Sequence, residues 1–369
     1  MSRVIPVKYE DRLCYEIYLE RNFEKLPGLL KELGYDGKRK VCVITDSNVA
    51  ALYLEMLSGV LKREFEVCTA YVFAAGESSK NTETVGGAYE HLIQNGFDRK
   101  DLIVALGGGV VGDLAGFTAA TYLRGIDFVQ VPTTLLSQVD SSIGGKTGVD
   151  FLQYKNMVGA FYMPKLVYMN LSVLASLPAE QYFSGMGEIL KHGQIKDADY
   201  YRQVSEAYAR VVDRDLDTVE EMVYGSCLIK RDVVERDPKE KGERALLNFG
   251  HTIGHAVEKL SDFRLLHGEC VALGMVGAAF LSCRYGRYGE AQLAELEGTL
   301  RNFQLPVRLK GQPAFSPEDV LATTKLDKKM ESGRIKFILL EAPGKAYITR
   351  DLTDEQILEG IRYLFAAEI

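Results

Sequence analysis

A chain of 369 residues, 47% of them hydrophobic and 26% charged, is long enough for two domains and has the composition of an ordinary globular protein. The formal net charge of −7 argues against a general nucleic-acid-binding protein, although a local basic pocket for an acidic small molecule remains compatible with it. The chain has no apolar run of membrane length and no signal-peptide core, and its six scattered cysteines lack a Cys-x-x-Cys pair, so we expect a cytoplasmic protein with no membrane partner and with buried, reduced thiols.

The first part of the chain alternates strand and helix signals. We expect one or two short strands and a helix within residues 1–40. Compact β-branched runs then predict buried strands, at residues 41–45, 66–73, 101–106, 127–131 and 166–169. Helices are expected between them, at residues 49–61, 84–95 and 114–122. Asp46 follows the strand at 41–45 and is placed to cap the next helix.

A glycine-rich turn follows the strand at 101–106. Gly107, Gly109 and Gly112 have the G-x-G-x-x-G spacing between a strand and a helix, the context in which this motif binds a dinucleotide. The glycines allow close approach of a pyrophosphate, whose charge the helix N-terminus stabilises. The alternative is a tight turn without a ligand. No isolated acid stands about 20 residues further on in the usual ribose position, so the Asp46–Asn48 turn is an alternative place for that contact.

A polar, glycine-rich segment at residues 138–148 follows the strand at 127–131, and Lys155 and Asn156 come soon after it. The segment is longer than an ordinary connection, so we interpret it as a functional loop. Taken alone, Lys146 and Lys155 are better explained as part of a solvated face.

From about residue 171 the apolar period changes to 3.6. This predicts helices at residues 178–194, 200–212, 216–234, 245–260, 268–285 and 289–302. A small hairpin at 335–340 and 346–349 is expected before a final helix at 354–367. We therefore predict an α/β fold with an N-terminal Rossmann-like domain over residues 1–170 and a mainly α-helical domain over residues 171–369.

Histidines concentrate between residues 240 and 269. In a continuous helix, His251 and His255 share a face, with Asn248 on nearly the same stripe. His267 follows closely, so the group resembles a zinc site that lacks one ligand. Two histidines at this spacing are nevertheless more often not ligands, and Thr252 excludes the metalloprotease motif.

Glycines interrupt the predicted helices that carry these polar groups. Gly250 and Gly254 immediately precede His251 and His255, and further glycines stand in segment 184–192, ahead of Glu188 and Lys191. Because glycine is a poor helix former, we expect a crowded backbone, for example from a nearby metal or ligand. Taken alone, Glu188 and Lys191 read as an ordinary pair on a helix surface.

Together these segments resemble the 3-dehydroquinate synthase family of the sugar-phosphate cyclase superfamily. The resembling stretches follow the order of the family and cover residues 105–121, 131–148, 155–161, 185–191, 242–258 and 267–269. The resemblance implies an N-terminal NAD-binding domain, a C-terminal helical metal-binding domain, and a cleft between them for a divalent metal, zinc with cobalt as the alternative.

The resemblance also assigns site residues. The metal ligands fall on Glu188, His251 and His267, which leave coordination positions open for substrate oxygens. The NAD contacts fall on Asp46, Asn48, Glu77, Lys80, Gly108, Gly109, Asp113, Thr133 and Thr134. The substrate contacts fall on Arg124, Asp140, Lys146, Lys155, Asn156, Lys191, Lys230, Arg244, Asn248 and Lys328. The catalytic roles fall on Glu240, His255, Lys146 and Lys191. Arg124 is expected to reach the phosphate across the interface of a homodimer.

The implied enzyme is a carbon–oxygen lyase of the shikimate pathway in aromatic amino acid biosynthesis. It converts 3-deoxy-D-arabino-heptulosonate 7-phosphate to 3-dehydroquinate and phosphate, through transient oxidation by NAD, β-elimination, re-reduction and an aldol closure. Lysines and an arginine in the motif segments suit this acidic, phosphorylated sugar. The alternatives are another cyclase, such as 2-deoxy-scyllo-inosose synthase, and a metal-dependent alcohol or glycerol dehydrogenase. A non-catalytic regulator is disfavoured, because it would not need acid–base groups beside the metal.

Overall fold

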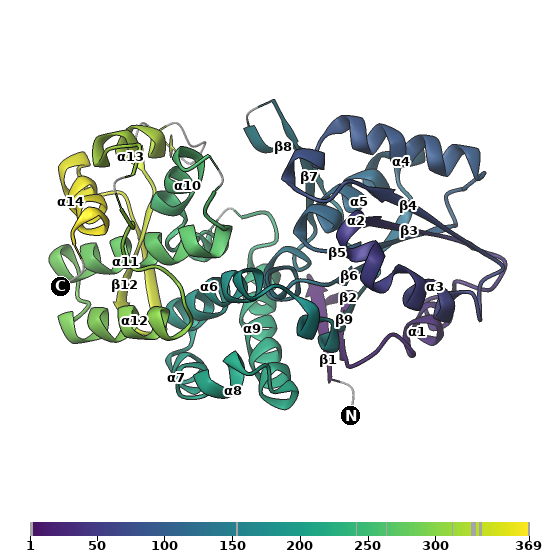
Figure 1. The fold of residues 1–369 in the computed structure, drawn as a ribbon, viewed down its shortest axis with the longest axis horizontal. Helices are drawn as coiled ribbons and strands as arrows, with labels where there is room; N and C mark the ends of the chain where they lie inside the picture. The colour runs from purple at the N-terminus through teal and green to yellow at the C-terminus, as the bar shows by residue number, and fades with distance from the viewer. Residues whose placement is uncertain are drawn as a thin grey trace. The chain divides into compact units, whose positions relative to one another are not determined.

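The structure is a computed structural model that describes residues 3–152, 154–240, 242–262, 264–311, 313–325, 330–331 and 334–367. The chain forms two units, Met1–Leu177 and Pro178–Ile369 (Figure 1). The predicted fold class is confirmed, because a mostly parallel sheet with helices precedes a mainly helical region. Within the described ranges, no helix is both long and apolar enough to cross a membrane.

A seven-stranded sheet forms the centre of the first unit. Its strands are β1 (Arg3–Tyr9), β2 (Arg12–Glu20), β3 (Lys40–Asp46), β4 (Val67–Phe73), β5 (Leu102–Gly107), β6 (Asp127–Pro132) and β9 (Leu166–Asn170). Their order in the sheet is β1-β2-β9-β6-β5-β3-β4. The β1–β2 hairpin is antiparallel, whereas every other neighbouring pair is parallel.

Helices cover both faces of this sheet, as its nearly continuous apolar strands require. Along β5, Leu102, Val104 and Leu106 face a core that is closed by α1 (Leu26–Glu32) and α3 (Glu55–Leu61). Ile103 and Ala105 face the opposite core, which α4 (Thr82–Gln94) and α5 (Gly109–Thr121) cover (Figure 1). This alternation is the two-residue period of a strand.

The remaining helices of the first unit are short. They are α2 (Ser47–Val49), the π-helices Ala50–Leu54 and Ser137–Ser141, and the 3-10 helices Glu77–Ser79, Tyr122–Arg124 and Leu171–Ser176. The last of these belongs to the first unit because Val173 packs into the core beside α1 and α3.

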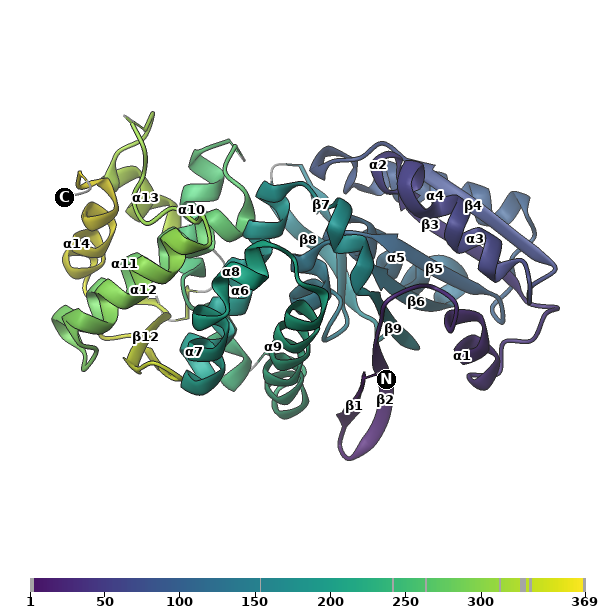
Figure 2. The same ribbon diagram turned by 60° about the horizontal axis from the view of Figure 1, so that its bottom comes forward.

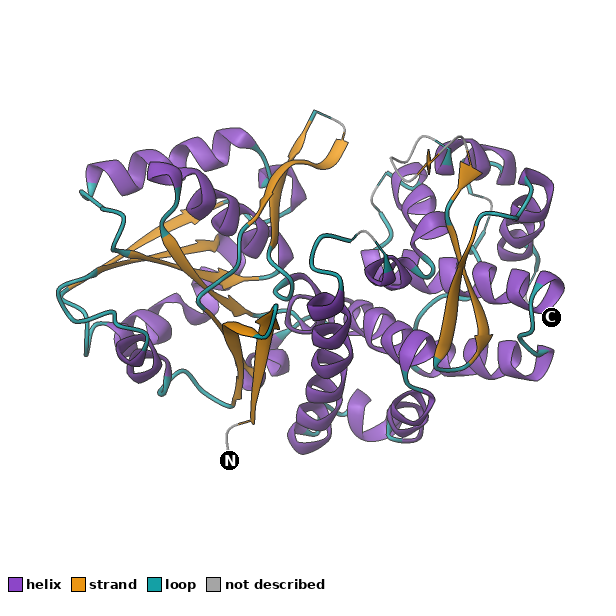
Figure 3. Cartoon of the chain, turned by 180° about the vertical axis from the view of Figure 1, so that it is seen from behind, coloured by secondary structure: helices purple, strands orange, loops and turns teal. Residues whose placement is uncertain are grey.

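The interpretation of the polar segment after residue 138 as a loop is wrong. A π-helix is followed by an antiparallel hairpin of β7 (Lys146–Phe151) and β8 (Tyr154–Phe161), which is visible in Figure 3. Gly148 lies opposite Gly159, and a Cβ at Gly148 would lie 2.8 Å from the carbonyl oxygen of Val158. The glycines therefore allow the two strands to approach closely. From composition alone, the same glycines suggested a loop.

Helices dominate the second unit. They are α6 (Ala179–Lys196), α7 (Ala198–Glu206), α8 (Tyr208–Val212), α9 (Leu216–Arg236), α10 (His251–Leu260), α11 (His267–Tyr285), α12 (Glu290–Asn302), α13 (Pro317–Thr324) and α14 (Asp354–Phe365). The strands are β10 (Met330–Glu331), β11 (Arg334–Ile335), β12 (Phe337–Ala342) and β13 (Lys345–Thr349). Helix α6 packs against α7, α9 and α11 (Figure 2), and the β12–β13 hairpin lies among the helices (Figure 3).

Two helix predictions need correction, and one helix was missed. The segment 245–260 is not one helix, because Gly250 has a φ of +79° and separates the 3-10 helix Glu243–Asn248 from α10. The segment 200–212 is divided between α7 and α8. Helix α13 was not predicted, although Ser316, Pro317 and Asp319 form a capping box with proline at the first helical position.

The cysteines only partly follow the prediction. All six are free thiols, but Cys14, Cys68 and Cys283 are partly exposed instead of buried. Burial raises the pKa of Cys42 to about 12, so this thiol is protonated at neutral pH.

Candidate metal and cofactor sites

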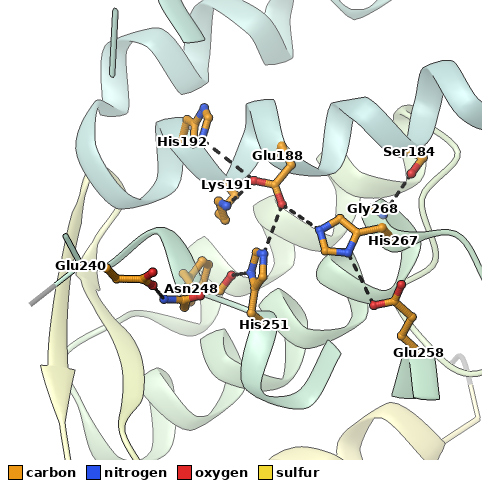
Figure 4. A network of polar contacts seen from close by, with 11 residues as sticks. Ser184, Glu188, Lys191, His192, Glu240, Asn248, His251, Glu258, His267 and Gly268 are labelled. Atoms are coloured by element: carbon orange, nitrogen blue, oxygen red, sulfur yellow. Dashed lines mark hydrogen bonds and ion pairs between the residues drawn. The ribbon is translucent and has the colours of Figure 1, made fainter. Parts of the chain in front are cut away.

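Three potential metal ligands converge within the second unit. Glu188 lies in α6, while His251 and His267 are the first residues of α10 and α11. Oε1 of Glu188 is 3.5 Å from Nε2 of each histidine, and the ligand atoms all lie within 4.8 Å of one another (Figure 4). One carboxylate and two imidazoles held on helices fit a catalytic zinc site, which keeps positions open for substrate.

Close helix contacts draw these ligands together. A Cβ at Gly187 would lie 2.7 Å from the carbonyl oxygen of Gly268, and a Cβ at Gly254 would lie 2.6 Å from that of Cys270. The backbone N–H of Gly268 donates to Oγ of Ser184 at 3.0 Å (Figure 4). The glycines therefore allow α6 and α10 to pack against the first turns of α11. The expected crowding of the backbone is present, and a neighbouring helix accounts for it at Gly187 and Gly254.

The second nitrogen of each histidine faces an oxygen. Nδ1 of His251 is 3.1 Å from the carbonyl oxygen of Phe249, and Nδ1 of His267 is 3.6 Å from Oε2 of Glu258. These contacts orient both rings with Nε2 toward Glu188. Burial disfavours the charged form of His267, but the Glu188 and Glu258 carboxylates outweigh it and raise its pKa to about 9. A metal ion must therefore displace a proton from this ring at neutral pH.

The other carboxylate oxygen of Glu188 is held from its own helix. Nζ of Lys191 donates to Oε2 of Glu188, and both side chains are fully buried, so their interpretation as a surface pair is wrong. They are buried because α6 runs between neighbouring helices, with residues 182–195 all buried. His192 lies 4.0 Å from the same oxygen and is bonded through Nδ1 to Oγ of Ser226 at 2.8 Å.

His255 lies beside the ligand group. Its ring centroid is 5.0 Å from that of His251 and 5.9 Å from that of His267. The predicted i,i+4 relation of His251 and His255 on one helix therefore holds. With Glu258 and His267, His255 also makes up a second group of potential ligand atoms.

The segment before α10 carries further predicted residues. Nδ2 of Asn248 donates to Oε1 of Glu240 at 2.8 Å (Figure 4). Asn248 ends a 3-10 helix, so it does not lie on one α-helical stripe with His251. The expectation that both share a stripe assumed an unbroken helix and is wrong. Arg244 donates from Nη1 to the carbonyl oxygen of Pro238 at 2.7 Å.

Buried cations accompany these groups in the second unit. Lys191, Lys230 and Arg244 are 1%, 5% and 3% exposed. Buried charges of this kind need partners, and an anionic ligand is one such partner. Lys328, the remaining predicted substrate contact of this unit, lies outside the described residues.

A separate group of predicted residues lies at the carboxyl ends of the strands in the first unit. The strand order reverses between β3 and β5, and open parallel sheets bind ligands at such a switch point. Strand β3 ends at Asp46, whose Oδ1 accepts from the backbone N–H groups of Asn48 and Val49. Strand β5 ends at Gly107, whose carbonyl oxygen accepts from the N–H of Thr133 at 2.9 Å.

The glycines of this turn meet close neighbours. A Cβ at Gly108 would lie 3.0 Å from Cγ2 of Thr134, and a Cβ at Gly109 would lie 3.2 Å from Oγ of Ser141. Gly108 is the N-cap of α5, which therefore begins at Gly109, earlier than predicted. Any side chain added here would occupy the space in front of the helix N-terminus, where an anion is favoured.

Lys80 and Asp113 form a largely buried ion pair near this turn, with Nζ and Oδ2 2.7 Å apart. Burial disfavours the charged ammonium, but the Asp113 and Glu77 carboxylates outweigh it and raise the pKa of Lys80. Lys80 also donates to Oδ1 of Asn156 at 2.6 Å. Glu77 is 3.6 Å from Nζ of Lys155, which is half-buried.

The other predicted substrate residues of the first unit are more dispersed. Asp140 lies in the π-helix Ser137–Ser141, and Lys146 is exposed at the start of β7. Arg124 is exposed just before β6, at the amino edge of the sheet, and has a φ of +66°. Within the chain, Arg124 is thus placed at the edge opposite the glycine turn.

Sequence reasoning missed Glu258 as the partner of His267. A signal was available, because Glu258 stands seven residues after His251 and three after His255, and such residues share one face of a helix. Helix α10 carries His251, His255 and Glu258.

Comparisons with known proteins cover both units. A sequence profile described as 3-dehydroquinate synthase N-terminal matches residues 70–184, and one described as 3-dehydroquinate synthase C-terminal matches residues 185–330. A 3-dehydroquinate synthase of Symbiobacterium thermophilum is 44% identical over 351 residues, which are 95% of this chain and 98% of that protein.

Solved structures of cyclases have the same fold. A 2-deoxy-scyllo-inosose synthase complexed with carbaglucose-6-phosphate, NAD+ and Co2+ is 25% identical with a TM-score of 0.88, over 98% of this chain and 99% of that one. The 2-epi-5-epi-valiolone synthase of Streptomyces hygroscopicus subsp. jinggangensis 5008, with NAD+ and Zn2+ bound, is 27% identical with a TM-score of 0.86, over 98% of this chain and 99% of that one. These similarities extend across nearly the whole chain.

Proposed function

This chain belongs to the 3-dehydroquinate synthase family, and from that premise we propose that it converts 3-deoxy-D-arabino-heptulosonate 7-phosphate to 3-dehydroquinate and phosphate, as a carbon–oxygen lyase. The conversion combines transient oxidation, β-elimination of phosphate, re-reduction and intramolecular aldol closure. The observation that carries the proposal is the convergence of Glu188, His251 and His267 next to the buried Lys191.

We assign a divalent metal to Glu188, His251 and His267, and NAD to the first unit. Zinc is the proposed metal, with cobalt as the alternative, because a carboxylate and two histidines suit both and cyclase structures contain either ion. When bound, the metal supplies a Lewis acid, and NAD accepts a hydride and returns it within one turnover. The outer contacts from Phe249 and Glu258 hold the imidazoles in place beforehand.

The cofactor residues are those gathered at the switch point of the sheet. The turn at Asp46 and Asn48 is assigned to the ribose, and the start of α5 to the pyrophosphate. The full set of proposed NAD contacts is Asp46, Asn48, Glu77, Lys80, Gly108, Gly109, Asp113, Thr133 and Thr134.

Residues of both units are assigned to the acidic substrate. In the second unit, the buried cations neutralise its negative groups, and Arg244 offers the planar fork that suits a carboxylate. The full set is Asp140, Lys146, Lys155, Asn156, Lys191, Lys230, Arg244, Asn248 and Lys328. Arg124, at the amino edge of the sheet, is assigned to the phosphate of the substrate that is bound to the second copy of a homodimer.

Proton transfer is assigned to His255 and Glu240. His255 is half-buried beside the rings of His251 and His267. It can therefore exchange a proton with the substrate alcohol that NAD oxidises. Glu240 is held by the amide of Asn248, which fixes the direction of its carboxylate. Lys146 and Lys191 complete the catalytic set by stabilising developing negative charge.

The test follows phosphate release and nicotinamide absorbance together. With the heptulosonate phosphate and NAD, we expect one phosphate released for each 3-dehydroquinate formed and no net accumulation of NADH. Stoichiometric NADH without phosphate would overturn the proposal in favour of a dehydrogenase. Turnover of glucose 6-phosphate in place of the heptulosonate would favour the 2-deoxy-scyllo-inosose synthase alternative.

A further inference from the structure

The segment Glu77–Lys80 contacts the β7–β8 hairpin through Glu77 and Lys80. Nζ of Lys80 donates to Oδ1 of Asn156 at 2.6 Å, and Oε1 of Glu77 is 3.6 Å from Nζ of Lys155. The backbone joins them as well, because the N–H of Asp150 donates to the carbonyl oxygen of Lys80 at 2.8 Å. The hairpin is therefore attached to this segment at Asp150, Lys155 and Asn156.

Lys80 is anchored on its other side to α5. Its ammonium pairs with Asp113 at 2.7 Å, and its side chain is only 6% exposed, so little water screens the interaction. A single buried ammonium thus contacts both the helix that begins at the glycine turn and the hairpin. Since a buried charge that loses a partner is costly, Lys80 resists moving away from either of them.

Asn156 adopts a conformation that needs such support. Its φ is +52°, in the left-handed region, which asparagine tolerates better than most residues. Its backbone N–H donates to Oδ1 of Asp150 at 2.7 Å, while its side-chain oxygen accepts from Lys80. A left-handed residue persists when its surroundings fix it from several sides, and such residues concentrate at ligand sites.

From this arrangement we infer that Lys80 is a positioning residue that acts through Asn156 and couples cofactor binding at α5 to the order of the Lys155–Asn156 turn of the hairpin. The inference rests on the proposed function, which assigns Glu77, Lys80 and Asp113 to NAD and the two hairpin residues to the substrate. A cofactor that immobilises Lys80 and Glu77 also reduces the conformational freedom of Asn156 and Lys155, which these two residues contact. The substrate then loses less entropy on binding, and by linkage it strengthens cofactor binding equally.

Amide hydrogen exchange of the full chain, with and without NAD, tests this inference. NAD should slow exchange at the start of α5 and, by at least about fivefold, in residues 150–157 of the hairpin. In Asn156→Ala the slowing at α5 should remain and that in the hairpin should disappear. Asn156→Asp should retain both, because a carboxylate accepts from Lys80 at least as well as an amide. Met157→Ala, which alters the neighbouring exposed side chain, is the matched control and should behave as the unaltered chain.

The outcomes separate the inference from the proposed function. If NAD slows exchange at α5 but leaves the hairpin unchanged in the unaltered chain, the coupling is overturned and the cofactor assignment stands. If NAD slows exchange nowhere in the first unit, the cofactor assignment itself is overturned. If Asn156→Ala retains the NAD effect in the hairpin, coupling exists but Lys80 does not transmit it through Asn156, and the inference is again overturned.

Discussion

Charge balance explains how Glu188 can lie in a fully buried position. Its carboxylate is compensated by Lys191, and the raised pKa of His267 places a second positive charge opposite Glu258. The charges of these four side chains therefore nearly cancel. Exchange of the His267 proton for a divalent ion adds one positive charge, which is the sign that an acidic, phosphorylated substrate requires.

The ligand assignment predicts unequal effects of neighbouring histidines. His251→Ala and His267→Ala should each lose stoichiometric metal after dialysis, because each removes a nitrogen that lies 3.5 Å from Glu188. His255→Ala should retain its metal but lose catalytic activity by roughly 10²- to 10⁴-fold, as expected for a lost acid–base group. Metal analysis of the three purified variants is the measurement. Full occupancy in both ligand variants would rule out this assignment.

Glu258 should influence metal affinity without binding the metal. Glu258→Gln weakens the acceptor that orients His267, so we expect about a 10- to 100-fold loss of affinity. Competition with a chromophoric chelator measures it. Lys259→Gln, on the adjacent exposed position of the same helix, is the control and should change affinity little. Equal affinities in both variants would assign Glu258 a purely structural role.

At the level of elements, periodicity predicted most of the sheet and the main helices, because each of these has a continuous apolar face. It could not predict where α10 begins. The left-handed φ of Gly250 interrupts an apparently unbroken helical pattern. Glycine is needed at this position because a Cβ there would lie 2.7 Å from the carbonyl oxygen of Val271. The β7–β8 hairpin was missed for a related reason: its glycines serve strand pairing that only the folded chain defines. Glu188 could be assigned only by resemblance, since a lone glutamate near a lysine carries no sign of burial.

The space around each glycine predicts opposite changes in stability for the same Gly→Ala substitution in α10 and in α12. Gly254→Ala places a methyl group 2.6 Å from the carbonyl oxygen of Cys270, so overpacking should lower the free energy of unfolding by about 1–3 kcal/mol, despite the better helix propensity of alanine. Gly298→Ala in α12 has no neighbour within 4 Å and should raise it by about 0.5–1 kcal/mol. Urea denaturation of both variants provides the comparison. A stabilised Gly254→Ala would show that the helices can separate without cost.

At the scale of the whole chain, the proposed metal ligands lie in one unit, and the switch point to which NAD is assigned lies in the other. The metal ligands and their oriented rings all belong to residues 178–369, whereas the switch point and the glycine turn belong to residues 1–177. The net charge of −7 gives no sign of the buried Lys191, Lys230 and Arg244. Composition therefore argued against a general nucleic-acid-binding protein but could not locate an anion site, which depends on where the cations lie.

This division predicts that each ligand stabilises its own unit. With NAD absent, a divalent metal at about 100 times its dissociation constant should add roughly 2.7 kcal/mol to the stability of the state that binds it. Hydrogen exchange should therefore slow in α6, α10 and α11, which carry the three proposed ligands, and much less in β3 and β5. His251→Ala should abolish the effect, while the converse addition of NAD without metal should slow exchange in β3, β5 and α5. Equal slowing of both units by metal alone would mean that the chain opens as one cooperative body, and that the ligand sites cannot be treated as separate sources of stability.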